Sequence, residues 1–132
     1  MKDREHTVMM RRTANIHRHQ VERAGKVGQQ LDYTLDELRT WVRQHLRTPC
    51  PYCGQELKAA NISVDHEVPT SRDGAWTAAN IRFICVRCNQ IKGALTAKEF
   101  SELTTLLHTW PSEAATSVLS RLRAGGKFIH HN

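Results

Sequence analysis

The stretch that decides the fold of this 132-residue chain is residues 50–93, which read CPYCGQELKAANISVDHEVPTSRDGAWTAANIRFICVRCNQIKG. Two Cys-x-x-C pairs enclose it, Cys50 with Cys53 and Cys85 with Cys88. Two residues between cysteines let a tight turn aim both sulfurs at one ion, and two such pairs complete a tetrahedron. Because four thiolates leave no open coordination position, the spacing predicts a structural Zn²⁺ site rather than a catalytic one.

A redox role is the alternative interpretation of the first pair, because CPYC is also the dithiol motif of glutaredoxins. That chemistry needs the first cysteine at a helix N-terminus that follows a strand. Here Gly54 follows the pair directly, and a second Cys-x-x-C is available to share a metal. The zinc interpretation is therefore favoured over the redox one.

The composition is that of a single globular domain with a small core and a basic surface. Apolar residues make up 39% of the chain but aromatic residues only 6%, so a structural metal would supply stability that side chains do not. The formal net charge is +6, which favours a polyanionic partner and places nucleic acid before an anionic membrane. A solvated basic surface without a partner is the other interpretation of this charge.

The N-terminal residues MKDREHTVMMRR contain no apolar segment of the kind that a secretory signal needs. No run of about 18 apolar residues occurs in the sequence, so no membrane-spanning helix is predicted. We therefore expect a cytoplasmic protein without a membrane partner. In a reducing compartment its cysteines favour a metal site over disulfides.

Residues 1–33 predict a basic arm that is partly helical and is interrupted at Gly25 and Gly28. The arm would either become ordered on DNA or remain a solvated leader. Residues 34–48 predict a helix that packs on the central module. Its apolar residues recur at spacings of three and four near 35–47.

The helix signals at both flanks are capping boxes. Thr34 with Glu37 marks the start of the helix near 35–47, which Pro49 would end. Thr96 and Glu99 form a second box.

Residues 96–132 predict two helices, the second starting near Pro111 and stopping at Gly125–Gly126. We expect both to pack against the strands, or to serve a homodimer if the protein is not a monomer.

The module itself spans residues 49–95. It predicts strands at 62–65 and 81–84, a loop between Pro69 and Asn80, and a helix that begins near Arg87 or Asn89.

Asp65 and His66 close the first predicted strand, inside the frame of cysteines. A neutral imidazole can take a proton from water, and the amide oxygen of Asn89, at a helix start, can ligate a hard cation. A simple N-cap is the alternative interpretation of Asn89. Adjacent strand residues point to opposite faces. The strand must therefore bend or end at this dipeptide if both side chains are to reach one ion.

This frame, from Cys50-x-x-Cys53 through Asp65-His66 and Asn80 to Cys85-x-x-Cys88-Asn89, resembles the zinc-containing HNH endonucleases over residues 50–93. The resemblance implies a ββα-metal fold, with two antiparallel strands and a helix around one divalent ion. The expected fold class is therefore α+β: a small zinc-stapled ββα module with flanking helices.

The resemblance also implies roles for the residues at matching positions. His66 corresponds to the general base, Asp65 and Asn89 to the ligands of the catalytic ion, and Asn80 to the residue that holds the histidine through the loop. Many members have histidine at the position of Asn89, so this chain is an H-N-N variant. An amide oxygen suits Mg²⁺ better than imidazole does, so the expected catalytic ion is Mg²⁺ or Mn²⁺.

The implied activity is hydrolysis of phosphodiester bonds in DNA, most readily double-stranded DNA. Four cations are candidate phosphate contacts: Arg72, Arg82, Arg87 and Lys92. The alternative is a zinc-dependent nucleic-acid-binding module that does not cleave, because such a module shares the cysteines and the positive charge.

Overall fold

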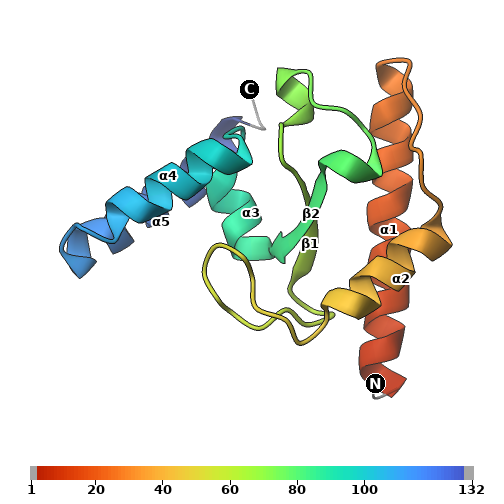
Figure 1. The fold of residues 1–132 in the computed structure, drawn as a ribbon, viewed down its shortest axis with the longest axis horizontal. Helices are drawn as coiled ribbons and strands as arrows, with labels where there is room; N and C mark the ends of the chain where they lie inside the picture. The colour runs from red at the N-terminus through yellow and green to blue at the C-terminus, as the bar shows by residue number, and fades with distance from the viewer. Residues whose placement is uncertain (1–2, 130–132) are drawn as a thin grey trace.

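A two-stranded antiparallel sheet lies at the centre of the chain, with helices on both of its faces (Figure 1). The computed structural model describes residues 3–129, and their side chains as far as Ala124. In chain order the elements are α1 (Asp3–Lys26), α2 (Leu35–His45), β1 (Ile62–His66), η1 (Thr70–Arg72), η2 (Ala78–Asn80), β2 (Ile81–Cys85), α3 (Val86–Lys92), α4 (Ala97–Leu107) and α5 (Ser112–Ile129). The expectation of an α+β fold is confirmed.

The β1, β2 and α3 segments form the predicted ββα unit. Ile62 pairs with Cys85 at one end of the ladder and His66 with Ile81 at the other. No loop separates β2 from α3, because Cys85 is at once the last strand residue and the N-cap of the helix. Gly93, at φ 53°, ends α3. The second strand therefore delivers the chain directly into the helix that packs back on the sheet.

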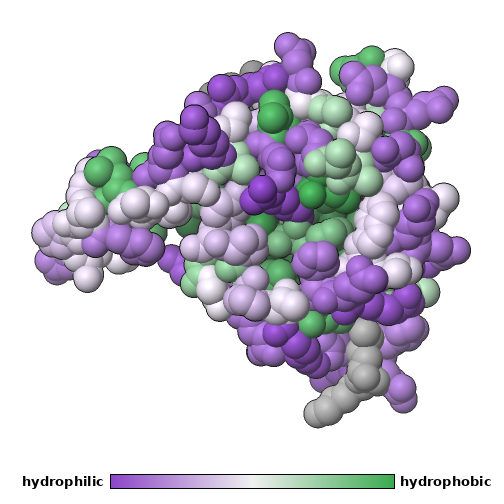
Figure 2. Space-filling view, in the orientation of Figure 1, coloured by the Kyte–Doolittle hydropathy of each residue, from purple (hydrophilic) through white to green (hydrophobic). Residues whose placement is uncertain are grey.

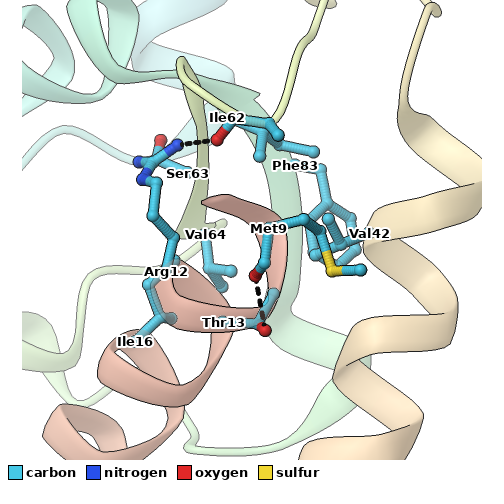
Figure 3. A pocket seen from close by; sticks show the side chains of 10 residues that line it. Met9, Arg12, Thr13, Ile16, Val42, Ile62, Ser63, Val64 and Phe83 are labelled. Carbon is cyan, nitrogen blue, oxygen red and sulfur yellow. Dashed lines mark hydrogen bonds between the residues drawn. The ribbon is translucent and has the colours of Figure 1, made fainter. Parts of the chain in front are cut away.

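The other face of the sheet is covered by α1 and α2. Figure 3 shows Met9 and Thr13 of α1 and Val42 of α2 gathered over Val64 and Phe83 of the sheet. The space left between them is only about 10 Å³. Since this is about the volume that one water molecule needs, the layer is a packed core and not a ligand site.

The N-terminal arm differs from the prediction. α1 runs unbroken through Gly25 to Lys26 and is packed into the fold, so it is neither an interrupted arm nor a solvated leader. Four of its residues are buried at helical spacing: Met9, Thr13, Gln20 and Ala24. The sequence does not show these positions as an apolar stripe, because two of the four residues are polar. Thr13 donates to the Met9 carbonyl (2.7 Å) and Gln20 accepts from the Tyr33 hydroxyl (2.6 Å).

Both predicted capping boxes are present, at Thr34 with Glu37 and at Thr96 with Glu99. Pro49 does not end α2, however. The helix stops at His45, and Arg47 turns the chain away with a φ of 74°.

The C-terminal helices also differ in two respects. α5 continues through Gly125–Gly126 to Ile129, so the glycine pair does not stop it. α5 packs along α3 rather than on the strand pair, and Figure 1 shows α4 and α5 extending from α3 away from α1. Within residues 3–129, no helix is both long enough and apolar enough to cross a membrane.

Candidate active site

The four cysteines form one cluster, built from the turn that carries Cys50 and Cys53 and from the junction of β2 with α3. Their Sγ atoms all lie within 4.8 Å of one another, and those of Cys53 and Cys85 are 3.7 Å apart. A Zn²⁺ with bonds of about 2.3 Å to four tetrahedral sulfurs separates them by about 3.8 Å, whereas a disulfide needs about 2.0 Å. The cluster therefore has the dimensions of a metal site.

All four thiols of this cluster can be deprotonated at once only if a cation is bound among them. Burial raises the pKa of Cys85 and of Cys88. Burial also acts to raise the pKa of Cys50, but hydrogen bonds from the backbone N–H groups of Cys85, Cys53 and Tyr52 lower it overall. A dicationic metal would offset the repulsion between the sulfurs.

The structure does not provide the local geometry that the redox interpretation needs. Residues 51–53 form a turn, and Pro49 and Glu56 on either side of it pair in an isolated β-bridge. No helix follows this turn directly. The next α-helix after Cys50 is α3, so the CPYC pair does not stand at a helix N-terminus.

On its α3 side, β1 presents Ser63 and Asp65. Asn89 donates from Nδ2 to Ser63 Oγ (3.2 Å) and to the Val64 carbonyl (3.4 Å). Lys92, three residues later on the same face of α3, donates to Asp65 Oδ1 (3.2 Å) and to the His66 carbonyl (3.0 Å). The structure therefore brings Asp65 and Asn89 to one strand–helix interface. Neither the Asp65 Oδ2 atom nor the Asn89 amide oxygen has a hydrogen-bond partner among the described residues.

Lys92 is an internal counter-ion and not a phosphate contact. Its side chain is 0% exposed and that of Asp65 only 6%. The ammonium faces the protein interior, so the prediction that Lys92 contacts phosphate is wrong. Burial raises the pKa of the Asp65 carboxyl, and the Lys92 charge acts in the opposite direction.

His66 points to the other face of the strand. The centroid of its ring lies 5.2 Å from that of Trp76, a residue of the loop between the two strands. The planes of the two rings meet at 69°. Nε2 is buried and has no hydrogen-bond partner among the described residues. Burial lowers the pKa of His66 to about 4, with further contributions from the charges of Arg23 and Lys92, so the imidazole is neutral near pH 7. The strand ends at His66, as the sequence required, but the two neighbouring side chains still diverge.

Asn80 joins the two ends of the loop that carries Trp76. Its Oδ1 accepts from the Val68 N–H (3.0 Å), and its Nδ2 donates to the carbonyls of Val68 (3.0 Å) and Ala75 (2.9 Å). Gly74 closes the same loop, because a Cβ there would lie 1.8 Å from the Val68 carbonyl oxygen. Asn80 thus acts on the loop backbone and does not contact the imidazole ring directly.

The three candidate arginines are exposed but differ in their partners. Arg72 is ion-paired with Glu99 and also donates to the Ala94 carbonyl (3.2 Å). Arg82 is ion-paired with Glu67, and Arg87 lies exposed in the first turn of α3. Their contacts with phosphate stay predictions.

Two residues that the sequence did not single out complete the surroundings of His66. Trp76 is only 4% exposed and forms the wall beside the imidazole. The Arg23 guanidinium of α1 lies over the Trp76 ring, 5.5 Å from its centroid. The available signal was the single aromatic residue of the loop between Pro69 and Asn80.

The fold defines a small ββα module with a cluster of four cysteines and, at the end of β1, buried polar atoms without partners among the described residues. Residues 50–104 match the model of the HNH endonuclease family, which confirms the resemblance that the motifs showed. The coarse activity that the family indicates for this segment is that of a nuclease.

A relative of stated function supports the same assignment. The CRISPR-associated endonuclease Cas9 of Corynebacterium diphtheriae is 39% identical over 51 residues. That match covers 38% of this chain but only 5% of the relative. The similarity is therefore one of a module within a much longer protein.

Proposed function

We propose that this chain is a metal-dependent endonuclease that hydrolyses phosphodiester bonds in double-stranded DNA. The observation that carries the proposal is the pair of buried, unpartnered atoms at the end of β1, Asp65 Oδ2 and His66 Nε2. Buried polar atoms in folded proteins are almost always satisfied, so two at one strand end indicate places for atoms of a ligand, an ion or a water molecule.

Asp65 Oδ2 and the amide oxygen of Asn89 would hold Mg²⁺ or Mn²⁺. Both are hard oxygen donors, and both lie between β1 and α3. Lys92 supports this arrangement by bonding to the other carboxylate oxygen, which leaves Oδ2 as the ligand atom. The bound ion would stabilise negative charge on the phosphate and on the leaving oxygen.

His66 would accept the proton of the attacking water. Its low pKa keeps the imidazole neutral, which is the form that a general base needs. Because Asp65 and His66 flank the end of β1 on opposite faces, the scissile phosphate would cross that end. Asn80 would act as a positioning residue, since it secures the loop that holds Trp76 against His66.

The cysteine cluster would hold a structural Zn²⁺. The four sulfurs come from the turn before β1 and from the junction of β2 with α3. An ion bound there would tie the turn before β1 to the junction of β2 with α3 without taking part in the chemistry.

The test uses supercoiled plasmid with Mg²⁺ or Mn²⁺, with and without chelator. Wild type should cleave only with the ion, and His66→Ala should lower the rate about 10²- to 10⁴-fold. His19→Ala is the matched control, because His19 lies exposed on α1 and should leave the rate unchanged. Inertness of the wild type on single- and double-stranded DNA would reject the proposed activity, and full activity of His66→Ala would reject the role of His66.

One observation favours the alternative, a zinc-dependent nucleic-acid-binding module that does not cleave. Asp65 is only 5% exposed and is already paired with Lys92. A module of that kind would bind DNA equally well with and without added Mg²⁺ and would leave the plasmid intact. The same assay, run beside a binding measurement, separates the two functions.

A further inference from the structure

The C-terminal end of α1 lies beside the loop between β1 and β2, although the two are far apart in the sequence (Figure 1). Three aromatic or cationic groups contact one another in a row there. The Arg23 guanidinium covers the face of Trp76, with 5.5 Å between Cζ and the ring centroid. The Trp76 ring in turn meets the His66 ring at 69°, with centroids 5.2 Å apart. α1 therefore reaches the proposed base through a single tryptophan.

The guanidinium of Arg23 has N–H groups available to bind a ligand in this position. It is exposed, and no carboxylate among the described residues pairs with it. Stacking on an aromatic ring uses the flat face of a guanidinium and leaves the N–H groups around its edge free. Those edges match the oxygens of a phosphate group. Arg72 and Arg82, by contrast, are already bonded to Glu99 and Glu67.

The position of Arg23 relative to His66 is also well defined. Trp76 is buried, and a second contact ties the same loop to the segment after α1. Asp32 Oδ1 accepts a hydrogen bond from the Ala78 N–H (2.7 Å) at the start of η2. The loop is thus held by two residues that precede the family segment 50–104.

We propose that Arg23 is a substrate-binding residue, whose guanidinium is held by Trp76 and binds a backbone phosphate of the nucleic acid beside His66. The inference rests on the proposed function and adds to it a contact from outside the nuclease module. Figure 2 shows that hydrophilic side chains cover most of the face presented in this view, with apolar side chains gathered near its centre.

The inference predicts that binding depends on Arg23 more than on other cations of α1. The measurement is fluorescence anisotropy of a labelled duplex of about 20 base pairs, in buffer without added Mg²⁺ or Mn²⁺, with the purified zinc-containing protein. Arg23→Gln should weaken binding about tenfold and reduce the salt dependence of binding by about one phosphate contact. Arg23→Lys should recover only part of the loss, because an ammonium does not stack as a planar group. Arg18→Ala, also exposed on α1, should change binding less than about twofold.

Equal binding by Arg23→Gln and wild type would overturn the inference, as would an equal loss in Arg18→Ala, which would indicate only diffuse charge. Because no catalytic ion is present, the result does not depend on cleavage. A protein that needs Arg23 to bind duplex but never cuts plasmid would reject the proposed activity and keep the binding role. In a protein that does cleave, Arg23→Gln should raise KM with a smaller change in kcat.

Discussion

The cysteine cluster and the end of β1 differ in how they arrange side chains: in the first they converge, and in the second they diverge. In the cluster, residues far apart in the sequence converge until all four sulfurs lie within 4.8 Å. At the strand end, Asp65 and His66 are neighbours in the sequence, yet one contacts α3 and the other contacts Trp76. A turn with two intervening residues brings side chains together, whereas a strand separates adjacent ones. Removing groups from each site should therefore affect stability and activity in different proportions.

Removal of one sulfur should have the largest effect. Cys88→Ser leaves an incomplete ligand set, and structural zinc sites contribute about 10–16 kcal/mol of binding free energy in small peptides. We expect loss of about one equivalent of zinc and of most cooperative thermal unfolding, measured by metal analysis and circular dichroism. Ser63→Ala, which removes hydrogen bonds to Ile84 and Asn89 but no sulfur, should keep both. Retention of a wild-type melt by Cys88→Ser would mean that the cluster is not structural.

Breaking the internal ion pair should come next. Lys92→Met leaves the Asp65 carboxylate buried without its partner, which typically costs about 3–5 kcal/mol. The double variant Lys92→Met with Asp65→Asn should regain much of that loss, because no uncompensated charge remains. Urea unfolding of both variants measures the difference. Additive losses in the double variant would show that the two groups do not depend on each other.

Asn80→Ala should cost less, about 1–3 kcal/mol, because it removes a side chain bonded three times to the loop backbone. Asn61→Ala is a matched control. Asn61 also secures a loop, through Lys58 N–H (2.7 Å) and the Glu56 carbonyl (3.0 Å), but it lies on the cysteine side. Both variants should lower the urea midpoint similarly, and only Asn80→Ala should slow plasmid cleavage. An equal effect on cleavage would indicate a loss of stability and not of positioning.

Asn89→Ala should have the smallest effect on stability, about 0.5–1 kcal/mol, because its two hydrogen bonds are long. Its effect on the catalytic ion should be larger, since the amide oxygen is a proposed ligand. Mn²⁺ binding, followed by calorimetry on zinc-containing protein, should weaken at least about tenfold. Unchanged Mn²⁺ affinity would leave Asn89 as a helix residue without a ligand role.

The parts of the fold that the sequence predicted are those set by local signals. Both capping boxes, the two strands and the helix after Cys85 follow from side chains within a few residues of each other. The four cysteines could be assigned to one cluster because their spacing alone implies convergence.

The parts that the sequence did not predict depend on contacts between distant segments. α1 was not recognised as a core helix because its buried stripe includes Thr13 and Gln20, whose partners lie in the tertiary structure. Lys92 was assigned to the surface because lysine is almost never fully buried. Only the three-dimensional arrangement shows that Asp65 faces it.

The burial of Lys92 also affects how the protein meets reagents that modify amines. An acylating reagent needs a solvated, unprotonated amine, so it should modify exposed Lys58 and Lys98 and spare Lys92 in the folded chain. Lys92 would become reactive only when β1 and α3 separate. Peptide mass mapping after brief acetylation would then report the opening of this one interface, without any engineered label.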